Sequence, residues 1–185
     1  MNDRLDQIAE LIPKDVKSIL DIGSGNKYFK KCTKKYCSLD VKDGDIVKDL
    51  NVSQKIPLRK ESFDMVILSQ ILEHLANPKE LIKESKRISK KFVLVGLPNE
   101  ITIDNRIKLL IGKPNRKGYS PYGHKHFFTI GTIEEFIKKM YGKYYKKIYI
   151  FSVKGGRFLP LSLRKRLAKM IPPIFAGEVY YLIKK

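Results

Sequence analysis

Short apolar runs alternate with other segments through the first hundred residues of the chain. Five runs have the length and composition of strands, namely residues 17–22, 36–40, 46–50, 63–68 and 92–97. Between them the pattern predicts helices over 5–12, 28–35 and 80–89. The run at 63–68 is almost continuously apolar, as in a parallel strand covered on both faces. We therefore predict an α/β fold with a doubly wound, mostly parallel sheet, whose ligands lie beyond the carboxyl ends of the strands.

The pattern changes after residue 100. It predicts two further helices and two late strands, at 103–111, 133–140, 148–153 and 178–183. The basic amphipathic stretch Leu161–Ile171 fits either a helix that caps the sheet or one that lies on an anionic membrane. Because there is no internal repeat and no long linker, we expect one domain over residues 1–185. Its substrate-side insertions would lie at about 101–128 and 155–176.

The net charge of +19 is unevenly distributed. Residues 101–185 hold half of the 38 Lys and Arg residues but only four acids, Asp104, Glu134, Glu135 and Glu178. This asymmetry indicates an anionic partner for the second half, such as nucleic acid, anionic lipid or a phosphorylated substrate. Solvated, lysine-rich helix surfaces would give the same composition, so both interpretations stay open.

The cysteine content and the hydropathy indicate where the protein resides. Cys32 and Cys37 are too few for a disulfide framework and lack the partners of a zinc site. The N-terminus has no signal-peptide core, and no apolar run approaches the roughly 20 residues that span a bilayer. We therefore expect a cytoplasmic protein.

A two-glycine turn, Asp21-Ile22-Gly23-Ser24-Gly25-Asn26, follows the first predicted strand. The glycines permit a tight turn and the close approach of a ligand to the backbone. The dinucleotide fingerprint GxGxxG is not met, because Tyr28 occupies its third glycine position, and the phosphate-loop pattern is absent. An acid ahead of such a turn suits a ligand with a positive amino group and a carboxylate. A purely structural turn is the alternative.

Two further acids follow predicted strands. Asp40 ends the second strand, where a carboxylate can accept hydrogen bonds from both hydroxyls of a ribose. Asp49 follows the third strand and could accept from an adenine amino group, with Leu50 against the ring. Either acid alone would more often be a turn residue or a helix cap. Together with Asp21, in order along one sheet edge, they favour a nucleoside ligand.

Five motifs resemble class I S-adenosylmethionine (SAM)-dependent methyltransferases, in particular the type 11 group. They are ILDIGSGNKYF, SLD, VKDL, FDMVILSQILEHLANP and GHKHFFT, within about residues 17–140. The resemblance implies SAM as methyl donor. It also implies a seven-stranded sheet of order 3-2-1-4-5-7-6 with strand 7 antiparallel.

The resemblance also implies roles for individual residues. Asp40 would hold the ribose, and Asp49 with Leu50 the adenine. Ser69 and Gln70 would lie beside the cofactor near the reactive methyl group. The methionine part would be lined by the glycine turn, with Asp21, Gly23, Ser24 and Gly25.

The chain departs from the family pattern at three places. Lys27 replaces the usual third glycine, where it would crowd the methionine carboxylate or pair with it. The Asp40–Asp49 connection is so short that we expect no helix between strands 2 and 3. Residues 157–176 match no family motif.

The chain has three histidines that are candidates for general-base catalysis. Such a base is needed only if the acceptor must lose a proton. We predict His74 and His126 as catalytic residues, although a structural histidine that bonds a neighbouring carbonyl is a strong alternative for His74. His124 and His126 alternate on an extended segment, but two ligands make a poor metal site. We therefore predict no metal.

The acceptor is not evident from the sequence. Tyr119, Tyr122, Phe127 and Phe128 could wall its site or close over it, while the two phenylalanines would equally suit the core. We predict methylation of a small or anionic acceptor. The alternatives are an RNA methyltransferase that uses its basic second half, with Lys113, Arg116, Lys117 and Lys125, and a non-catalytic protein that binds an adenosyl ligand or RNA. The oligomeric state is not predicted.

Overall fold

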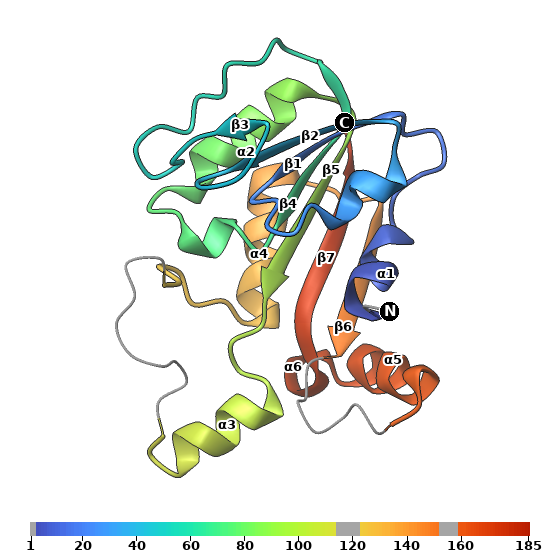
Figure 1. Cartoon of the computed structure of the whole chain (residues 1–185). Helices are drawn as coiled ribbons and strands as arrows, with labels where there is room; N and C mark the ends of the chain where they lie inside the picture. The colour runs from blue at the N-terminus through green and yellow to red at the C-terminus, as the bar shows by residue number, and fades with distance from the viewer. Residues whose placement is uncertain (1–2, 114–122, 152–158) are drawn as a thin grey trace.

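The computed structural model describes residues 3–113, 123–151 and 159–185. One seven-stranded sheet runs through these ranges in the order β3-β2-β1-β4-β5-β7-β6 (Figure 1). Only β7 is antiparallel to its neighbours, β5 and β6. The predicted order and the predicted antiparallel strand are therefore confirmed. The strands are β1 (Ser18–Ile22), β2 (Lys35–Asp40), β3 (Ile46–Val47), β4 (Phe63–Ser69), β5 (Ser89–Pro98), β6 (Lys146–Phe151) and β7 (Ala176–Lys184).

Helices cover both faces of the sheet (Figure 1). Those of the first half are α1 (Asp3–Ala9), α2 (Pro78–Ile88) and the short 3-10 helices η1 (Tyr28–Cys32) and η2 (Leu72–His74). Those of the second half are α3 (Ile103–Leu110), α4 (Ile130–Tyr141), α5 (Leu161–Met170) and α6 (Pro172–Phe175). The apolar residues of α2 and α4 pack in one core cluster, and those of α1 and η1 in the other.

The central strands are apolar on both faces because helices cover both. Every residue of β1 is buried, and so are the first six of β4, from Phe63 to Leu68. Alternate residues go to opposite faces. Accordingly, Val66 and Leu68 join the cluster under α2 and α4, whereas Met65 and Ile67 join the one under α1.

Two predicted elements are much shorter than expected. The helix predicted over 28–35 is only η1, since Lys35 already pairs with Ser18 in the sheet. The third strand ends at Val47 and does not reach Leu50. There the Asp49 carboxylate accepts a hydrogen bond from the Asn51 N–H at 2.8 Å and stabilises a turn. The absence of a helix from 41–45 is confirmed.

The basic stretch of the second half forms α5, which contacts β6 and buries Ala168. Leu161, Leu163 and Met170 remain exposed. A peripheral contact with an anionic membrane stays a prediction. Within the described ranges, no helix has the length and apolar character needed to cross a membrane.

Candidate functional site

The turn after β1 has a backbone that favours glycine. Gly23 has φ 73° and Gly25 has φ 47°, both in the left-handed region. The Gly23 N–H donates to the Leu39 carbonyl oxygen at 2.8 Å, which ties the turn to β2. A Cβ atom at Gly23 would lie 3.1 Å from Ile71 Cδ1, closer than a normal contact. Position 23 therefore needs a glycine for two reasons, the left-handed backbone conformation and the lack of room for a Cβ beside Ile71.

Lys27, at the position of the usual third glycine, has a backbone conformation that favours glycine. Its φ of 54° and ψ of 34° are left-handed, a conformation that a lysine adopts only at some cost. The ammonium group donates to Asp43 Oδ1 at 2.9 Å. The lysine is thus paired with a carboxylate of the 41–45 turn.

Asp21, at the start of the turn, is a deeply buried acid with 1% of its surface exposed. The Tyr36 hydroxyl donates to Oδ2 at 2.7 Å, but Oδ1 has no hydrogen-bond partner within the described part of the chain. Burial raises the pKa of Asp21 to about 6, against the lowering effect of the Tyr36 hydrogen bond. An orphaned, buried carboxylate oxygen is costly without a partner, so it suits a ligand that brings a positive group.

Replacing Asp21 by asparagine is expected to stabilise the ligand-free protein above about pH 6. The folded-state pKa lies above the ordinary 3.8, so the folded state favours the protonated acid. As the pH rises from about 4 to about 6, the unfolded state ionises first and the wild type loses stability, by about 2 kcal/mol at most. Urea unfolding of Asp21→Asn and wild type at pH 4 and pH 8 measures this. An equal stability difference at both pH values would contradict it.

A cavity of about 250 Å³ opens beside the turn, at the carboxyl ends of β1 and β2. Five predicted residues lie in its wall, namely Gly23, Asp40, Asp49, Leu50 and His74. Asp40 also connects the two strand ends, because its Oδ2 accepts from the Gly25 N–H at 3.1 Å. The fold therefore brings together the glycine turn, both strand-end acids and one histidine.

Four other predicted residues belong to the turn and the end of β4 and are not in the cavity wall. Ser24 and Gly25 belong to the turn, and the Ser24 hydroxyl is buried without a partner in the described ranges. The Ser69 hydroxyl lies 2.9 Å from the Tyr180 hydroxyl. Gln70 has φ 57°, and its buried side-chain nitrogen is another unpaired polar atom among the described residues. Strained backbone and unpaired buried polar atoms are both typical of functional sites.

Two of the three histidines lie together near this cavity. The rings of His74 and His124 meet edge to face, with centroids 4.7 Å apart. The Glu100 carboxylate is hydrogen-bonded to Nδ1 of His124. Glu73 is fully buried beside them, and burial raises its pKa to about 7. Glu73 and Glu100 were not predicted as site residues, since only the fold brings η2, residue 100 and residue 124 together.

His126 is not in the cavity wall, and its Nε2–H donates to the Leu75 carbonyl oxygen at 2.9 Å. Phe128 is buried and packs against Phe136, whereas Phe127 is exposed. Ile71, which lines the cavity and leaves little room for a Cβ at position 23, was also not predicted as a site residue. Tyr119, Tyr122, Arg116 and Lys117 lie outside the described residues.

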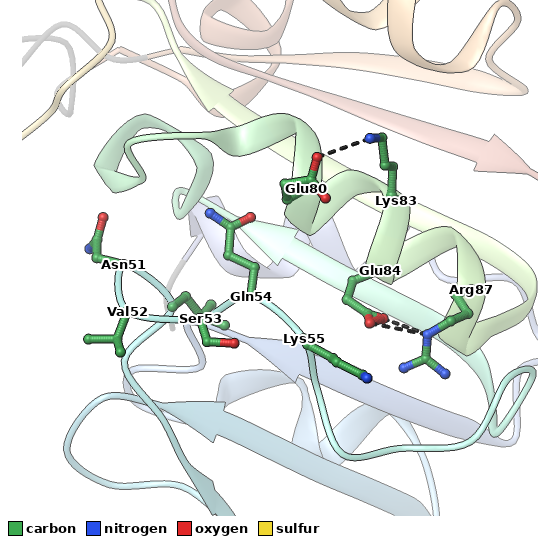
Figure 2. A pocket seen from close by; sticks show the side chains of 10 residues that line it. Asn51, Val52, Ser53, Gln54, Lys55, Glu80, Lys83, Glu84 and Arg87 are labelled. Carbon is green, nitrogen blue, oxygen red and sulfur yellow. Dashed lines mark hydrogen bonds and ion pairs between the residues drawn. The ribbon is translucent and has the colours of Figure 1, made fainter.

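A second cavity, of about 550 Å³, separates residues 51–55 from α2 (Figure 2). Figure 2 shows that its charged groups on α2 pair with each other. Lys83 Nζ lies 3.0 Å from Glu80 Oε1, and Arg87 Nε lies 2.5 Å from Glu84 Oε2. Arg87 also donates to the Leu58 carbonyl oxygen at 2.7 Å. Because these charges are satisfied internally, the smaller cavity at the glycine turn is the better candidate site.

Solved structures with this fold include many SAM-dependent methyltransferases. The chain is 16% identical to one from Archaeoglobus fulgidus, with a TM-score of 0.62, covering 98% of this chain and 91% of that one. It is 16% identical to another from Thermotoga maritima, with a TM-score of 0.65, covering 99% of this chain and 88% of that one. The small RNA methyltransferase HEN1 is 11% identical with a TM-score of 0.65, where the match covers 98% of this chain but 25% of HEN1.

These likenesses show the fold, and the predicted class I methyltransferase architecture is confirmed. No protein of curated function matches the chain significantly. A family model described as methionine biosynthesis protein MetW matches residues 22–169, which is most of the chain. The chain therefore belongs to the MetW family.

Proposed function

We propose that this protein is a methyltransferase that binds SAM in the cavity beside the glycine turn. SAM is the cofactor that this fold leads us to expect. The observation that carries the proposal is the joint lining of one cavity by Gly23, Asp40, Asp49 and Leu50. Asp21 precedes the glycine turn, and its Oδ1, which has no hydrogen-bond partner among the described residues, fits the positively charged end of the cofactor.

Each part of the cofactor has a counterpart in this arrangement. Asp21 and the glycine turn would hold the methionine part, and Asp40 the ribose hydroxyls. Asp49 and Leu50 would hold the adenine, which needs a hydrogen-bond acceptor and an apolar surface. Because Lys27 is paired with Asp43, the lysine need not crowd the methionine carboxylate. Ser69 and Gln70, at the end of β4, would lie toward the reactive methyl group.

Bound SAM supplies a methyl group on a sulfonium centre, which is a good leaving group. The chain itself then has to position donor and acceptor in line and to exclude water. A proton acceptor is needed only for a hydroxyl or a protonated amine. Of the two predicted histidines, the contacts favour His74 for a role near the acceptor. His74 lines the cavity, whereas Nε2 of His126 is bonded to the Leu75 carbonyl oxygen.

The acceptor is proposed to be small or anionic, given the excess of Lys and Arg in the second half. Exposed cations of α5, including Lys165, Arg166 and Lys169, contribute to that excess. The family description points to methionine biosynthesis as the setting. RNA is the second candidate acceptor, favoured by the shared fold of HEN1 together with the basic second half.

Replacing Asp40 by alanine is expected to weaken binding of SAM and of S-adenosylhomocysteine at least about 10-fold. The physical reason is the loss of charge-assisted hydrogen bonds, each worth about 1.5–3 kcal/mol. Isothermal titration calorimetry measures both ligands. Glu80→Ala is the matched control, because Glu80 lines the second cavity and not the one beside the glycine turn. The affinity of this variant for both ligands should equal that of the wild type. Absence of binding to the wild type at millimolar ligand would overturn the cofactor assignment and favour a non-catalytic, RNA-binding protein.

A further inference from the structure

Glu73, His74 and His124 converge from two distant segments of the chain. One possible ligand atom from each lies within 4.8 Å of those from the other two. Backbone hydrogen bonds hold the segments together, because the Lys125 N–H donates to the Glu73 carbonyl oxygen at 2.6 Å, and the His126 N–H at 3.3 Å. The cluster is therefore built into the fold and does not depend on a chance contact between flexible side chains.

The carboxylate of Glu73 is the least satisfied group of the cluster. The residue has no exposed surface, and neither carboxylate oxygen has a hydrogen-bond partner among the residues that the structure describes. A buried carboxylate without partners costs several kcal/mol unless something neutralises it. A cation between Glu73 and the two imidazoles would satisfy it.

His124 has a carboxylate partner of the kind that accompanies ligating histidines. The Glu100 carboxylate is hydrogen-bonded to Nδ1, so a metal ion would bind at Nε2. A carboxylate behind a ligating histidine fixes the tautomer and increases the basicity of the ligating nitrogen. Glu100 is itself placed by its N–H, which donates to the Phe128 carbonyl oxygen at 2.8 Å.

We propose that Glu73, His74 and His124 form a binding site for a divalent transition-metal ion such as Zn²⁺. Two imidazole nitrogens and one carboxylate oxygen suit zinc and its first-row neighbours, whereas Mg²⁺ and Ca²⁺ favour oxygen ligands. Three protein ligands leave at least one coordination position open. The sequence prediction of no metal considered only His124 with His126, and the fold pairs His124 with Glu73 and His74 instead.

The site would also bear on methyl transfer, a step that rests on the proposed function. Because His74 lines the cofactor cavity as well, the ion lies at its wall. The open position then takes an oxygen or nitrogen atom of the acceptor. A bound cation would lower the pKa of a coordinated hydroxyl, so the acceptor could lose its proton to solvent water, and its oxygen would then attack the methyl group of SAM.

The test is a calorimetric titration of the whole, metal-free chain with Zn²⁺ in the absence of SAM. We expect one ion per chain, and at least about 100-fold weaker binding in Glu73→Gln and in His124→Asn. His126→Asn is the matched control and should stay within about threefold of wild type, because its ring bonds the Leu75 carbonyl oxygen. Glu100→Gln should weaken binding about 10- to 100-fold, as expected of a group that orients a ligand.

A second measurement covers the case in which a variant fails to fold. Co²⁺ bound to the wild type should give the visible absorption of a low-coordinate site with nitrogen and oxygen ligands, which Zn²⁺ then displaces. No binding of either ion at 1 mM would overturn the site, as would unchanged Zn²⁺ affinity in folded Glu73→Gln and His124→Asn. Zn²⁺ binding without S-adenosylhomocysteine binding would support the metal site while overturning the proposed function.

Discussion

Replacing Gly23 by valine is expected to lower the affinity for SAM at least about 100-fold, since two separate costs act on one residue. A β-branched residue rarely adopts a φ of 73°, and this backbone strain costs about 1–2 kcal/mol or more. The added Cβ would also lie 3.1 Å from Ile71 Cδ1, and Ile71 lines the cavity beside the glycine turn. Relief of that contact moves Ile71 or the turn, and either movement changes the cavity wall. Calorimetric titration with S-adenosylhomocysteine measures the loss.

Gly25→Ala is the control for Gly23→Val. Gly25 also has a positive φ, of 47°, but a Cβ there meets no atom of the described residues within 4 Å. This variant should show the cost of backbone strain alone and should bind much more tightly than Gly23→Val. Circular dichroism and thermal unfolding establish that both variants fold. A folded Gly23→Val protein with wild-type affinity would mean that the ligand does not bind beside this turn.

The second large effect is expected in the sheet, where Gly96→Ala should destabilise the protein by about 3 kcal/mol. A Cβ atom at Gly96 would collide with the ring of Tyr180, which is fully buried on the neighbouring strand β7. The ring cannot move freely, because its hydroxyl is bonded to Ser69 at 2.9 Å and to Arg4 at 3.0 Å. Overpacking of this kind typically costs about 1–3 kcal/mol. Urea unfolding gives the free energy directly.

Gly131→Ala provides the matched control for this substitution. Gly131 lies in α4, where a Cβ would approach only Thr129 Oγ1, at 3.9 Å. Alanine is the better helix former, so this variant should be unchanged or more stable by up to about 1 kcal/mol. Equal stability of Gly96→Ala and wild type would show that β5 and β7 do not pack as described.

The strands were predictable because the central sheet is covered on both faces. Such a strand is a short apolar run, and the runs at 17–22 and 63–68 needed no knowledge of their partners. The position of the acids in the cavity wall was predictable for a related reason. In a parallel sheet the carboxyl ends of neighbouring strands meet at one edge, so Asp40 and Asp49 had to lie near the glycine turn.

Other features depended on contacts that a local pattern does not show. The segment 28–35 has the composition of a helix, but pairing of Lys35 with Ser18 ends it early. His126 has the spacing of a residue that faces the pocket, yet its ring bonds the Leu75 carbonyl oxygen. The convergence of Glu73 with His124 joins positions 51 residues apart in the chain and comes only from the tertiary fold.

A crystal structure of the protein with S-adenosylhomocysteine tests the central claim most directly. We predict the adenosyl group in the cavity beside the glycine turn, with the Asp40 carboxylate about 3 Å from the ribose hydroxyls. Asp49 and Leu50 should contact the adenine, and the sulfur should lie toward Ser69 and Gln70. A ligand bound instead between residues 51–55 and α2, or a crystal soaked at millimolar concentration with no ligand in either cavity, would contradict the assignment.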